Sequence, residues 1–212
     1  MPIFNTEYKS YYDRHTEYQE VEYIESSWTQ YIDTWIAMKN WFKIICNTEF
    51  VSRWTYMCLW WYLWPSWWVQ YRMYWWAHNS AWMYWFVWNY SNATGNASLN
   101  TKYKLELQVK SWNNYFKVDN TIIYSWTETF STSLSGNIWV LAGYADDASW
   151  KRNKWSAKMY NYKVRDNNWT LIRDFVPCYR KSDNVIWMYD TVNDQFYTNA
   201  GSWTFTKWAD VN

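Results

Sequence analysis

Short runs of alternating polar and apolar residues dominate the chain. In residues 102–110 (KYKLELQVK) every second residue is apolar, as in a strand that buries one face. Residues 158–164 (KMYNYKV) alternate likewise and predict a strand with Met159 and Tyr162 on opposite faces. Residues 138–142 form a continuous apolar run, which is typical of a central strand buried on both faces.

A hairpin and several further strands complete the pattern. Residues 115–119 and 121–124 flank Asn120 in a hairpin-like arrangement (NNYFKVDNTIIY). Further strands are expected at residues 21–25, 30–36, 43–50, 171–175 and 185–189. No window carries a long stripe of helical period, and strands recur at intervals of about 8–12 residues. This organisation favours an all-β fold, either a sandwich of two antiparallel sheets or a barrel.

The length of 212 residues suits a single domain of this class. No linker rich in Pro, Gly or Ser divides the chain. Residues 1–19 are polar and rich in Tyr, and we interpret them as an N-terminal arm or connector. Residues 20–212 are then predicted to form one β-sandwich domain.

The Trp and Gly contents are unusual. The chain has 23 Trp and 4 Gly, whereas Gly alone normally makes up about 7% of residues. Many Trp residues fall where the pattern predicts turns, and eight of them follow Ser or Asn: Trp28, Trp41, Trp67, Trp112, Trp126, Trp150, Trp169 and Trp203. Asn167, Asn168 and Trp169 lie between two predicted strands, where Asn-Gly in a type I′ turn is favoured. Such a turn needs positive φ, which suits Gly and not Trp.

Three segments resemble one known family. Residues 21–36 (VEYIESSWTQYIDTWI) resemble the opening "EYIES-S/T-G-TQYIDTG" of a concanavalin A-like lectin/glucanase domain of the laminin-G-like jelly-roll type. Residues 157–178 (AKMYNYKVRDNNWTLIRDFVPC) resemble its penultimate hairpin, and residues 184–205 (NVIWMYDTVNDQFYTNAGSWTF) resemble its closing segment. The resemblance covers roughly residues 20–208. It implies a two-sheet antiparallel β-sandwich with a lectin-like role, as in phage tail and gut-bacterial surface proteins.

The chain departs from the family pattern mainly by carrying Trp in place of Gly. The positions that match a family Gly include Trp28, Trp35, Trp169, Trp187 and Trp203. Trp139, inside the apolar run, is interpreted as a genuine aromatic residue. Our hypothesis is that UGA codons that specify Gly in the source have been read as Trp. The alternative is a truly Trp-rich binding protein.

Charge and cysteine content exclude several classes. Lys and Arg number 20 and Asp and Glu 19, a net charge of +1, which argues against a nucleic-acid partner. Three Cys without a CxxC motif or a His cluster indicate neither a disulfide framework nor a zinc site. The N-terminus lacks the features of a signal peptide. The uncharged stretch 54–71 contains Thr, Tyr, Pro, Ser and Gln, so we expect no membrane span.

Catalytic chemistry is not indicated by the sequence. A retaining glycosidase needs two carboxyl groups about 5–5.5 Å apart. The strand-like segments offer no such pair, since Glu106 is accompanied by the amide Gln108. His15 and His78 have no matching nucleophile, so a catalytic triad is not supported. We therefore predict that the protein is not an enzyme. A divergent glycoside hydrolase is one alternative, and a structural or oligomerising domain of a virion is another.

The resemblance implies a surface glycan as the ligand, bound by aromatic rings together with polar side chains. The candidate ligand-binding residues are Tyr71, Arg72, Tyr74, His78, Asn79 and Tyr84. Laminin-G-like domains often bind calcium, and Asp146 and Asp147, with Asp119 or Asn120, are the candidate ligands. No other cofactor is expected. The family context suggests a virion tail or a cell surface, with the N-terminal arm docking into a larger assembly or homo-oligomer.

Overall fold

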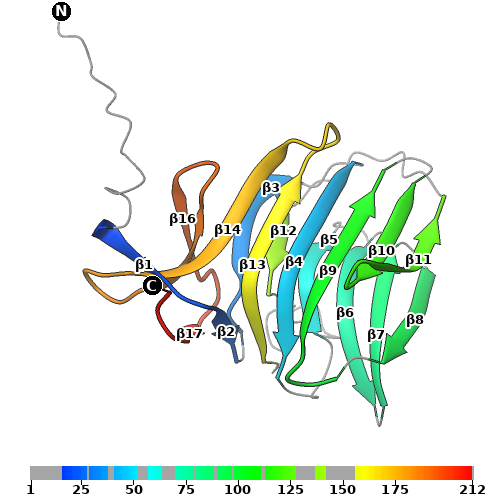
Figure 1. Ribbon diagram of the computed structural model, residues 1–212, viewed down its shortest axis with the longest axis horizontal. Helices are drawn as coiled ribbons and strands as arrows, with labels where there is room; N and C mark the ends of the chain where they lie inside the picture. The colour runs from blue at the N-terminus through cyan, green and yellow to red at the C-terminus, as the bar shows by residue number, and fades with distance from the viewer. Residues whose placement is uncertain are drawn as a thin grey trace, which may run out of the picture.

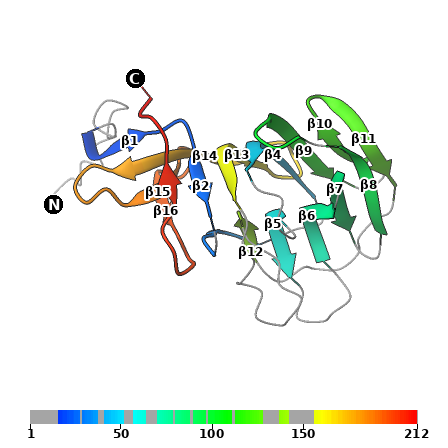
Figure 2. The ribbon, with the colours of Figure 1, turned by 90° about the horizontal axis from the view of Figure 1, so that it is seen from below.

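Two antiparallel β-sheets pack face to face in this protein (Figures 1 and 2). The computed structural model describes residues 16–27, 29–37, 41–51, 57–63, 70–78, 80–87, 90–96, 98–110, 113–127, 137–141 and 156–211. For Ala37, Trp139 and the strands between residues 57 and 96 it describes the backbone alone. The arrangement confirms the predicted all-β sandwich. Within the described residues, no helix is long and apolar enough to cross a membrane.

The larger sheet has eleven strands. They are β1 (Tyr18–Glu20), β2 (Ile24–Ser26), β4 (Phe42–Phe50), β9 (Lys102–Val109), β10 (Asn114–Val118), β11 (Thr121–Trp126), β13 (Ala157–Arg165), β14 (Leu171–Arg180), β15 (Ile186–Asp190), β16 (Gln195–Thr198) and β17 (Thr206–Lys207). The main path runs β11–β10–β9–β4–β13–β14–β15–β16, while β1 pairs with β14, and β2 pairs with β13 and β17.

The smaller sheet has six strands. They are β3 (Ile32–Ala37), β5 (Met57–Leu63), β6 (Gln70–His78), β7 (Ser80–Val87), β8 (Tyr90–Asn96) and β12 (Asn137–Val140). Their order is β3–β12–β5–β6–β7–β8. The predicted central strand is confirmed, because β12 lies between β3 and β5. It ends at Val140, and Leu141 follows with a left-handed φ of 59°.

Apolar side chains fill the space between the two sheets. Tyr162, Phe116 and Phe175 are the largest of these buried side chains on the large sheet, and Ile32 lies opposite on the small one. Each fully buried apolar side chain of this size contributes about 1.5–3 kcal/mol. A second cluster of Tyr18, Cys178, Trp187 and Tyr189 packs β1 onto β14 and β15. The free thiols of Cys46 and Cys178 are buried, and burial raises the pKa of both.

The opening and closing segments of the chain lie side by side. Val21 forms a bridge with Asp210, and β2 pairs with β17 (Figure 1). Tyr18 to Glu20 pair with β14 as strand β1. Residues 1–15 lie outside the described residues, so the division of the chain at residue 20 stays a prediction.

The predicted hairpin at Asn120 is confirmed. Strands β10 and β11 pair in antiparallel register with Val118 opposite Thr121. The two linking residues, Asp119 and Asn120, have φ of 49° and 71°. Two successive left-handed residues define a type I′ turn, and Asp and Asn tolerate that conformation better than other side chains.

The predicted faces of β13 are wrong in part. Met159 is fully buried on the same side as Tyr162 and Val164, rather than opposite them. The register against β4 shifts between Met159 and Asn161, which marks a β-bulge at Tyr160. A bulge inserts one extra residue, so the alternation of faces changes phase there.

The turn between β13 and β14 also differs from the predicted type I′ turn. Trp169 N donates to the Asp166 carbonyl at 3.0 Å, and Trp169 alone in this turn has positive φ, at 65°. This is a type I turn followed by a left-handed residue, a position that Gly usually occupies. Trp35, inside β3, is a second Trp with a left-handed backbone: its φ is 54° and its side chain is 71% exposed.

The other Trp residues divide between loops and strands. Trp41 and Trp203 lie in bends, the first half-buried and the second exposed. Trp126 and Trp187 were expected at turn or Gly positions, but they lie in β11 and β15 and are buried. Trp28 and Trp112 lie outside the described residues.

The family Gly that the chain retains in its closing segment is required by a close approach. A Cβ atom on Gly201 would lie 1.9 Å from the Thr29 carbonyl oxygen. No side chain fits at that distance without moving the backbone. The closing segment therefore packs against residues 27–31 through a true glycine.

Candidate ligand-binding site

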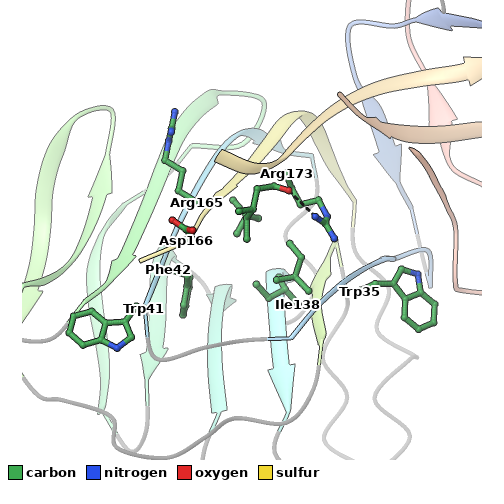
Figure 3. A pocket seen from close by; sticks show the side chains of 10 residues that line it. Trp35, Trp41, Phe42, Ile138, Arg165, Asp166 and Arg173 are labelled. Carbon is green, nitrogen blue, oxygen red and sulfur yellow. Dashed lines mark hydrogen bonds between the residues drawn. The ribbon is translucent and has the colours of Figure 1, made fainter. Parts of the chain in front are cut away.

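A pocket of about 430 Å³ opens between the sheets where β4 begins and β13 ends (Figure 3). This volume lies in the range of about 300–1,000 Å³ that is typical of small-ligand sites. Its lining residues come from β3, β4, β12, β13 and β14 and their ends: Trp35, Ile36, Trp41, Phe42, Ile138, Val164, Arg165, Asp166, Ile172 and Arg173.

The inner wall of the pocket is apolar. Phe42, Ile138 and Val164 point inward from three strands, and each is at most 4% exposed. Trp41 and Trp35 lie on opposite sides of the pocket, and the Trp35 ring points away from the centre of the pocket (Figure 3). The pocket therefore offers one aromatic edge, Phe42, that does not depend on either Trp.

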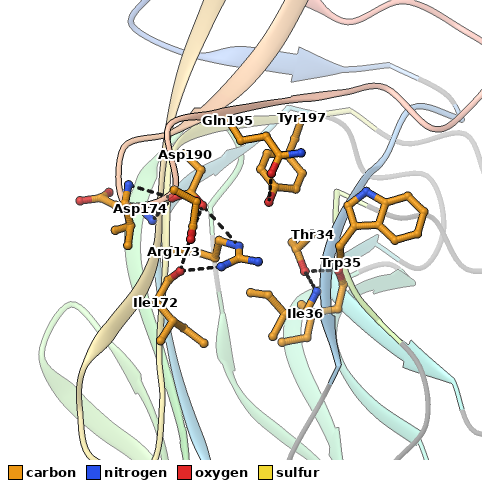
Figure 4. A network of polar contacts seen from close by, with 12 residues as sticks. Thr34, Trp35, Ile36, Ile172, Arg173, Asp174, Asp190, Gln195 and Tyr197 are labelled. Atoms are coloured by element: carbon orange, nitrogen blue, oxygen red, sulfur yellow. Dashed lines mark hydrogen bonds and ion pairs between the residues drawn. The ribbon is translucent and has the colours of Figure 1, made fainter. Parts of the chain in front are cut away.

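Arg173 is the cation on this inner wall. It pairs in register with the buried Val164, so its side chain points between the sheets. Its Nη1 donates to the Ile172 carbonyl at 2.8 Å, and its Nε lies 3.3 Å from Asp190 Oδ2 (Figure 4). The Nε contact is ionic rather than a well-aligned hydrogen bond, so this buried N–H has no acceptor among the described residues.

Asp190 holds Arg173 in place from the hairpin between β15 and β16. The Asp190 carboxylate is fully buried. Its Oδ1 accepts hydrogen bonds from the backbone N–H groups of Asp174 and Val192, and its Oδ2 accepts one from Asn193 Nδ2. A carboxylate with this many donors keeps its position. The guanidinium beside it is therefore fixed at the pocket wall.

Arg165 and Asp166 form the edge of the pocket. Arg165 Nη1 donates to the backbone carbonyl of Trp169 at 2.8 Å. Asp166 Oδ1 accepts from the backbone N–H groups of Asn168 and Thr170, both at 2.9 Å. Asp166 is the one carboxylate among the described lining residues. Its hydrogen bonds stabilise the turn between β13 and β14, which accounts for an Asp at this position.

Two further carboxylates are held on the outer face of the large sheet. Glu106 Oε1 lies 3.1 Å from Lys43 Nζ and accepts a hydrogen bond from the Tyr115 hydroxyl at 2.5 Å. Burial raises the pKa of Glu106, but the Tyr115 and Lys43 hydrogen bonds outweigh burial, and the net pKa is lowered. Burial and Glu106 together raise the pKa of Tyr115 to about 12.

Glu49 repeats this arrangement at the other end of β4. It accepts hydrogen bonds from Lys158 Nζ at 2.6 Å and from the Tyr160 hydroxyl at 2.7 Å. These contacts outweigh the effect of burial and lower the pKa of Glu49. Both carboxylates therefore stay ionised and paired, as surface links between neighbouring strands.

Glu106→Gln should reduce the acid sensitivity of the protein. A carboxyl whose folded pKa is lowered stabilises the fold above its unfolded pKa, and that contribution is lost as pH falls through the folded pKa. The variant should be less stable than the parent at neutral pH but lose less stability between about pH 5 and pH 3. Urea unfolding at a series of pH values measures this. Glu22→Gln, at an exposed position, is the control, and an unchanged slope for Glu106→Gln would contradict the prediction.

The residues predicted from the sequence fall in a different part of the fold. Tyr71, Arg72, Tyr74 and His78 lie on β6, and Tyr84 lies on β7, where it pairs in register with Tyr74. Their side chains, like Asn79 as a whole, lie outside the described residues, so this candidate site stays a prediction. The pocket at Arg173 was not predicted, because its lining converges from five separate strands.

The predicted calcium ligands are only partly described. Asp146 and Asp147 lie outside the described residues. Asp119 Oδ1 accepts from Lys104 N at 2.8 Å, and Asn120 Oδ1 accepts from Lys104 Nζ at 3.2 Å. Within the part of the chain that the structure describes, no group of three or more His, Cys, Asp or Glu is arranged to hold a metal ion. Calcium binding stays a prediction.

Comparison with known proteins supports the fold. No protein-family model and no curated protein sequence matches the chain. One similar structure is a protein of Bacteroides ovatus to which carbohydrate binding has been ascribed. It has a TM-score of 0.60 and 9% identity, and the match covers 91% of this chain and 62% of that one. At this identity the likeness shows the fold alone, a sandwich of two β-sheets.

Two more distant structures also match. A heptameric SAP-like pentraxin from Limulus polyphemus has a TM-score of 0.46 and 8% identity, with 68% of this chain and 76% of that one covered. A sialidase from Trypanosoma rangeli has a TM-score of 0.46 and 12% identity, with 60% of this chain and 20% of that one covered. The chain thus spans less than two thirds of the Bacteroides protein and a fifth of the sialidase.

Proposed function

We propose that this protein binds a carbohydrate through the pocket at Arg173 and does not hydrolyse it. The observation that carries the proposal is a fixed inward-facing Arg173 on an otherwise apolar and aromatic wall. Sugars combine apolar ring faces with hydroxyl groups, so they need this mixture of surfaces. The Arg173 side chain is 20% exposed and lines the pocket, so its guanidinium offers N–H donors to a hydroxyl oxygen. The fold shared with the Bacteroides protein agrees with this role.

The absence of hydrolysis is part of the proposal. Hydrolysis of a glycosidic bond normally requires two carboxyl groups on either side of it. The described lining offers Asp166 alone, and its Oδ1 already binds two backbone N–H groups. A reducing-sugar assay tests this, and release that is lost in Asp166→Asn would establish an enzyme instead.

We place the domain, as a proposal, in a phage tail or on a cell surface. We expect a single sugar site to bind in the millimolar to micromolar range, so adhesion needs several copies displayed together. The predicted N-terminal arm, residues 1–19, would supply such copies by docking into an assembly. Binding to cells by the oligomer and its loss in the monomer would test this.

We also propose that Trp35 and Trp169 are misread glycines. Both have left-handed backbone conformations, which a bulky side chain adopts at a cost of about 1–2 kcal/mol. Among the described residues, the other non-Gly residues with positive φ are Asn and Asp, apart from Leu141. Asn and Asp are the types that tolerate this conformation. Trp187 has no such backbone signature and packs edge-on against Phe196.

Filling the pocket should abolish glycan binding without changing any charge. Ile172 lines the pocket and is partly exposed, so Ile172→Trp should occupy the ligand volume. Ile122→Trp, at an exposed position on β11, is the matched control. Glycan-array screening followed by titration calorimetry should show binding by the parent and the control but at least about tenfold weaker binding by Ile172→Trp. Equal binding by all three proteins would exclude this pocket.

A further inference from the structure

Three cations gather beside the pocket, at the end of the large sheet where β4 begins. Arg165 lines the pocket, Lys43 follows the lining residue Phe42, and Lys110 directly follows β9. The sheet register pairs Arg165 with Lys43 and Phe42 with Val109, which brings all three to the same end of neighbouring strands. Lys43 points to the outer face of the large sheet, where it pairs with Glu106, and the pocket lies on the inner face. We call this set, Lys43, Lys110 and Arg165, the cationic rim.

The charges of the cationic rim are poorly compensated. Lys43 shares the single carboxylate of Glu106 with Lys117, whose Nζ lies 3.8 Å from it. Within the described residues, neither Lys110 nor Arg165 is paired with a carboxylate. Like charges at this spacing repel one another, so an anion at the rim would be stabilised by all three groups.

The geometry gathers these groups around one residue. The Nζ atoms of Lys43 and Lys110 lie 4.7 Å and 4.5 Å from the centre of the Trp169 ring. Arg165 binds the carbonyl of the same residue at 2.8 Å. The Arg165 contact is made by the backbone, so it does not depend on the side chain at position 169. With Gly at that position the two ring contacts are absent, and the sheet register alone places Lys43 and Lys110 near Arg165. Arg165 points away from Phe42 and Ile138, toward the outer edge (Figure 3).

We infer that the glycan bound by the pocket is acidic, and that its carboxylate or sulfate group binds the cationic rim. The inference rests on the proposed function and adds the class of ligand. A sugar ring enters between Phe42 and Arg173, while its negative group extends past Arg165 over the start of β4 and accepts charge-assisted hydrogen bonds from Lys43, Lys110 and Arg165. The chain as a whole carries a net charge of only +1, so this concentration of positive charge is local.

The number of cations favours a glycan over a nucleic acid. Proteins that bind DNA through its backbone neutralise about 6–10 phosphates. The rim has three cations beside a pocket of about 430 Å³, which suits one charged group attached to one or two sugar rings.

The test compares ligands that differ only in charge. The full chain is titrated with an oligogalacturonate, with its methyl ester, which has the same sugar backbone without charge, and with a sulfated galactan oligosaccharide. We expect the acidic forms to bind about tenfold more tightly than the ester, with an advantage that falls as salt is raised. Lys43→Gln and Lys110→Gln should each weaken binding of the acid about three- to tenfold and leave binding of the ester unchanged.

Lys104→Gln is the matched control. It removes the same charge from an exposed position on the same strand, about 20 Å from Lys110. Lys110→Gln keeps the test valid if Lys43→Gln disturbs folding through Glu106. Equal affinity for acid and ester, or equal loss in the control, overturns the inference while leaving the proposed function intact. Binding to duplex DNA as tight as to the acidic glycans also overturns it. Binding to none of the glycans overturns the proposed function itself.

Discussion

Asp190→Asn should destabilise the protein by about 3 kcal/mol. The substitution keeps the size of the side chain but removes the charge that balances Arg173. Breaking one partner of a buried ion pair costs about 3–5 kcal/mol because it leaves a buried charge without compensation. Asp190 is fully buried, whereas the Arg173 side chain is 20% exposed, so the lower end of that range applies. Urea unfolding followed by intrinsic fluorescence measures the change.

Two further variants separate charge from shape. Asp183→Asn removes the acid of an exposed pair with Arg180 and should behave like the parent protein, because such surface pairs contribute little. Adding Arg173→Met to Asp190→Asn should restore part of the lost stability, since the unbalanced charge is then gone. If the double variant is less stable than Asp190→Asn alone, the ion pair is not what Asp190 contributes.

Arg173 illustrates what the sequence could and could not predict. In LIRDF it stands two residues before Phe175, so strand alternation alone places a charged side chain on the inner face. The inward position of Arg173 was therefore predictable. Its ion pair and its place in a pocket were not, because the partner Asp190 and the pocket wall at Ile138 come from strands distant in sequence. A site assembled from five strands is visible only once the register between them is known.

The strands themselves were predictable wherever one face is buried and the other exposed. Alternation in β9 gave its faces correctly, and Asn120 marked the hairpin between β10 and β11. Alternation gave the wrong face for Met159 in β13, because a bulge at Tyr160 shifts which residues face the core. No local composition marks that bulge, since it arises from pairing with β4.

The same substitution should have opposite effects at two Trp positions. Trp35 is left-handed and exposed, with few contacts to lose, so Trp35→Gly should stabilise the protein by about 1 kcal/mol. Trp187 is buried against Phe196 and beneath Arg180. Trp187→Gly should therefore destabilise it by about 3–5 kcal/mol, because it leaves a cavity in the second core cluster. Thermal and urea unfolding of the two variants measure both changes.

Trp169→Gly refines this contrast. Its left-handed backbone predicts a gain, but two cation–π contacts with Lys43 and Lys110 are lost, each contributing about 0.5–1 kcal/mol. The net change should thus lie closer to zero than that of Trp35→Gly. Asn120→Gly, at a left-handed residue that tolerates the conformation, is the control and should change little. If Trp35→Gly destabilises the protein, backbone strain at position 35 is absent.

The stability effects bear on whether the Trp residues are misread glycines. Peptide masses measured on the natural protein decide that question. A protein isolated from its natural source should give peptides around positions 35 and 169 whose masses correspond to Gly. Trp and Gly differ by a fixed and large mass, so each site can be read separately. Among the described residues, the literal sequence has three exposed indoles, Trp35, Trp203 and Trp208, which favour aggregation. Masses that match Trp at both left-handed sites would defeat the misreading hypothesis and leave a truly Trp-rich surface, whose exposed rings are then available to stack on sugars.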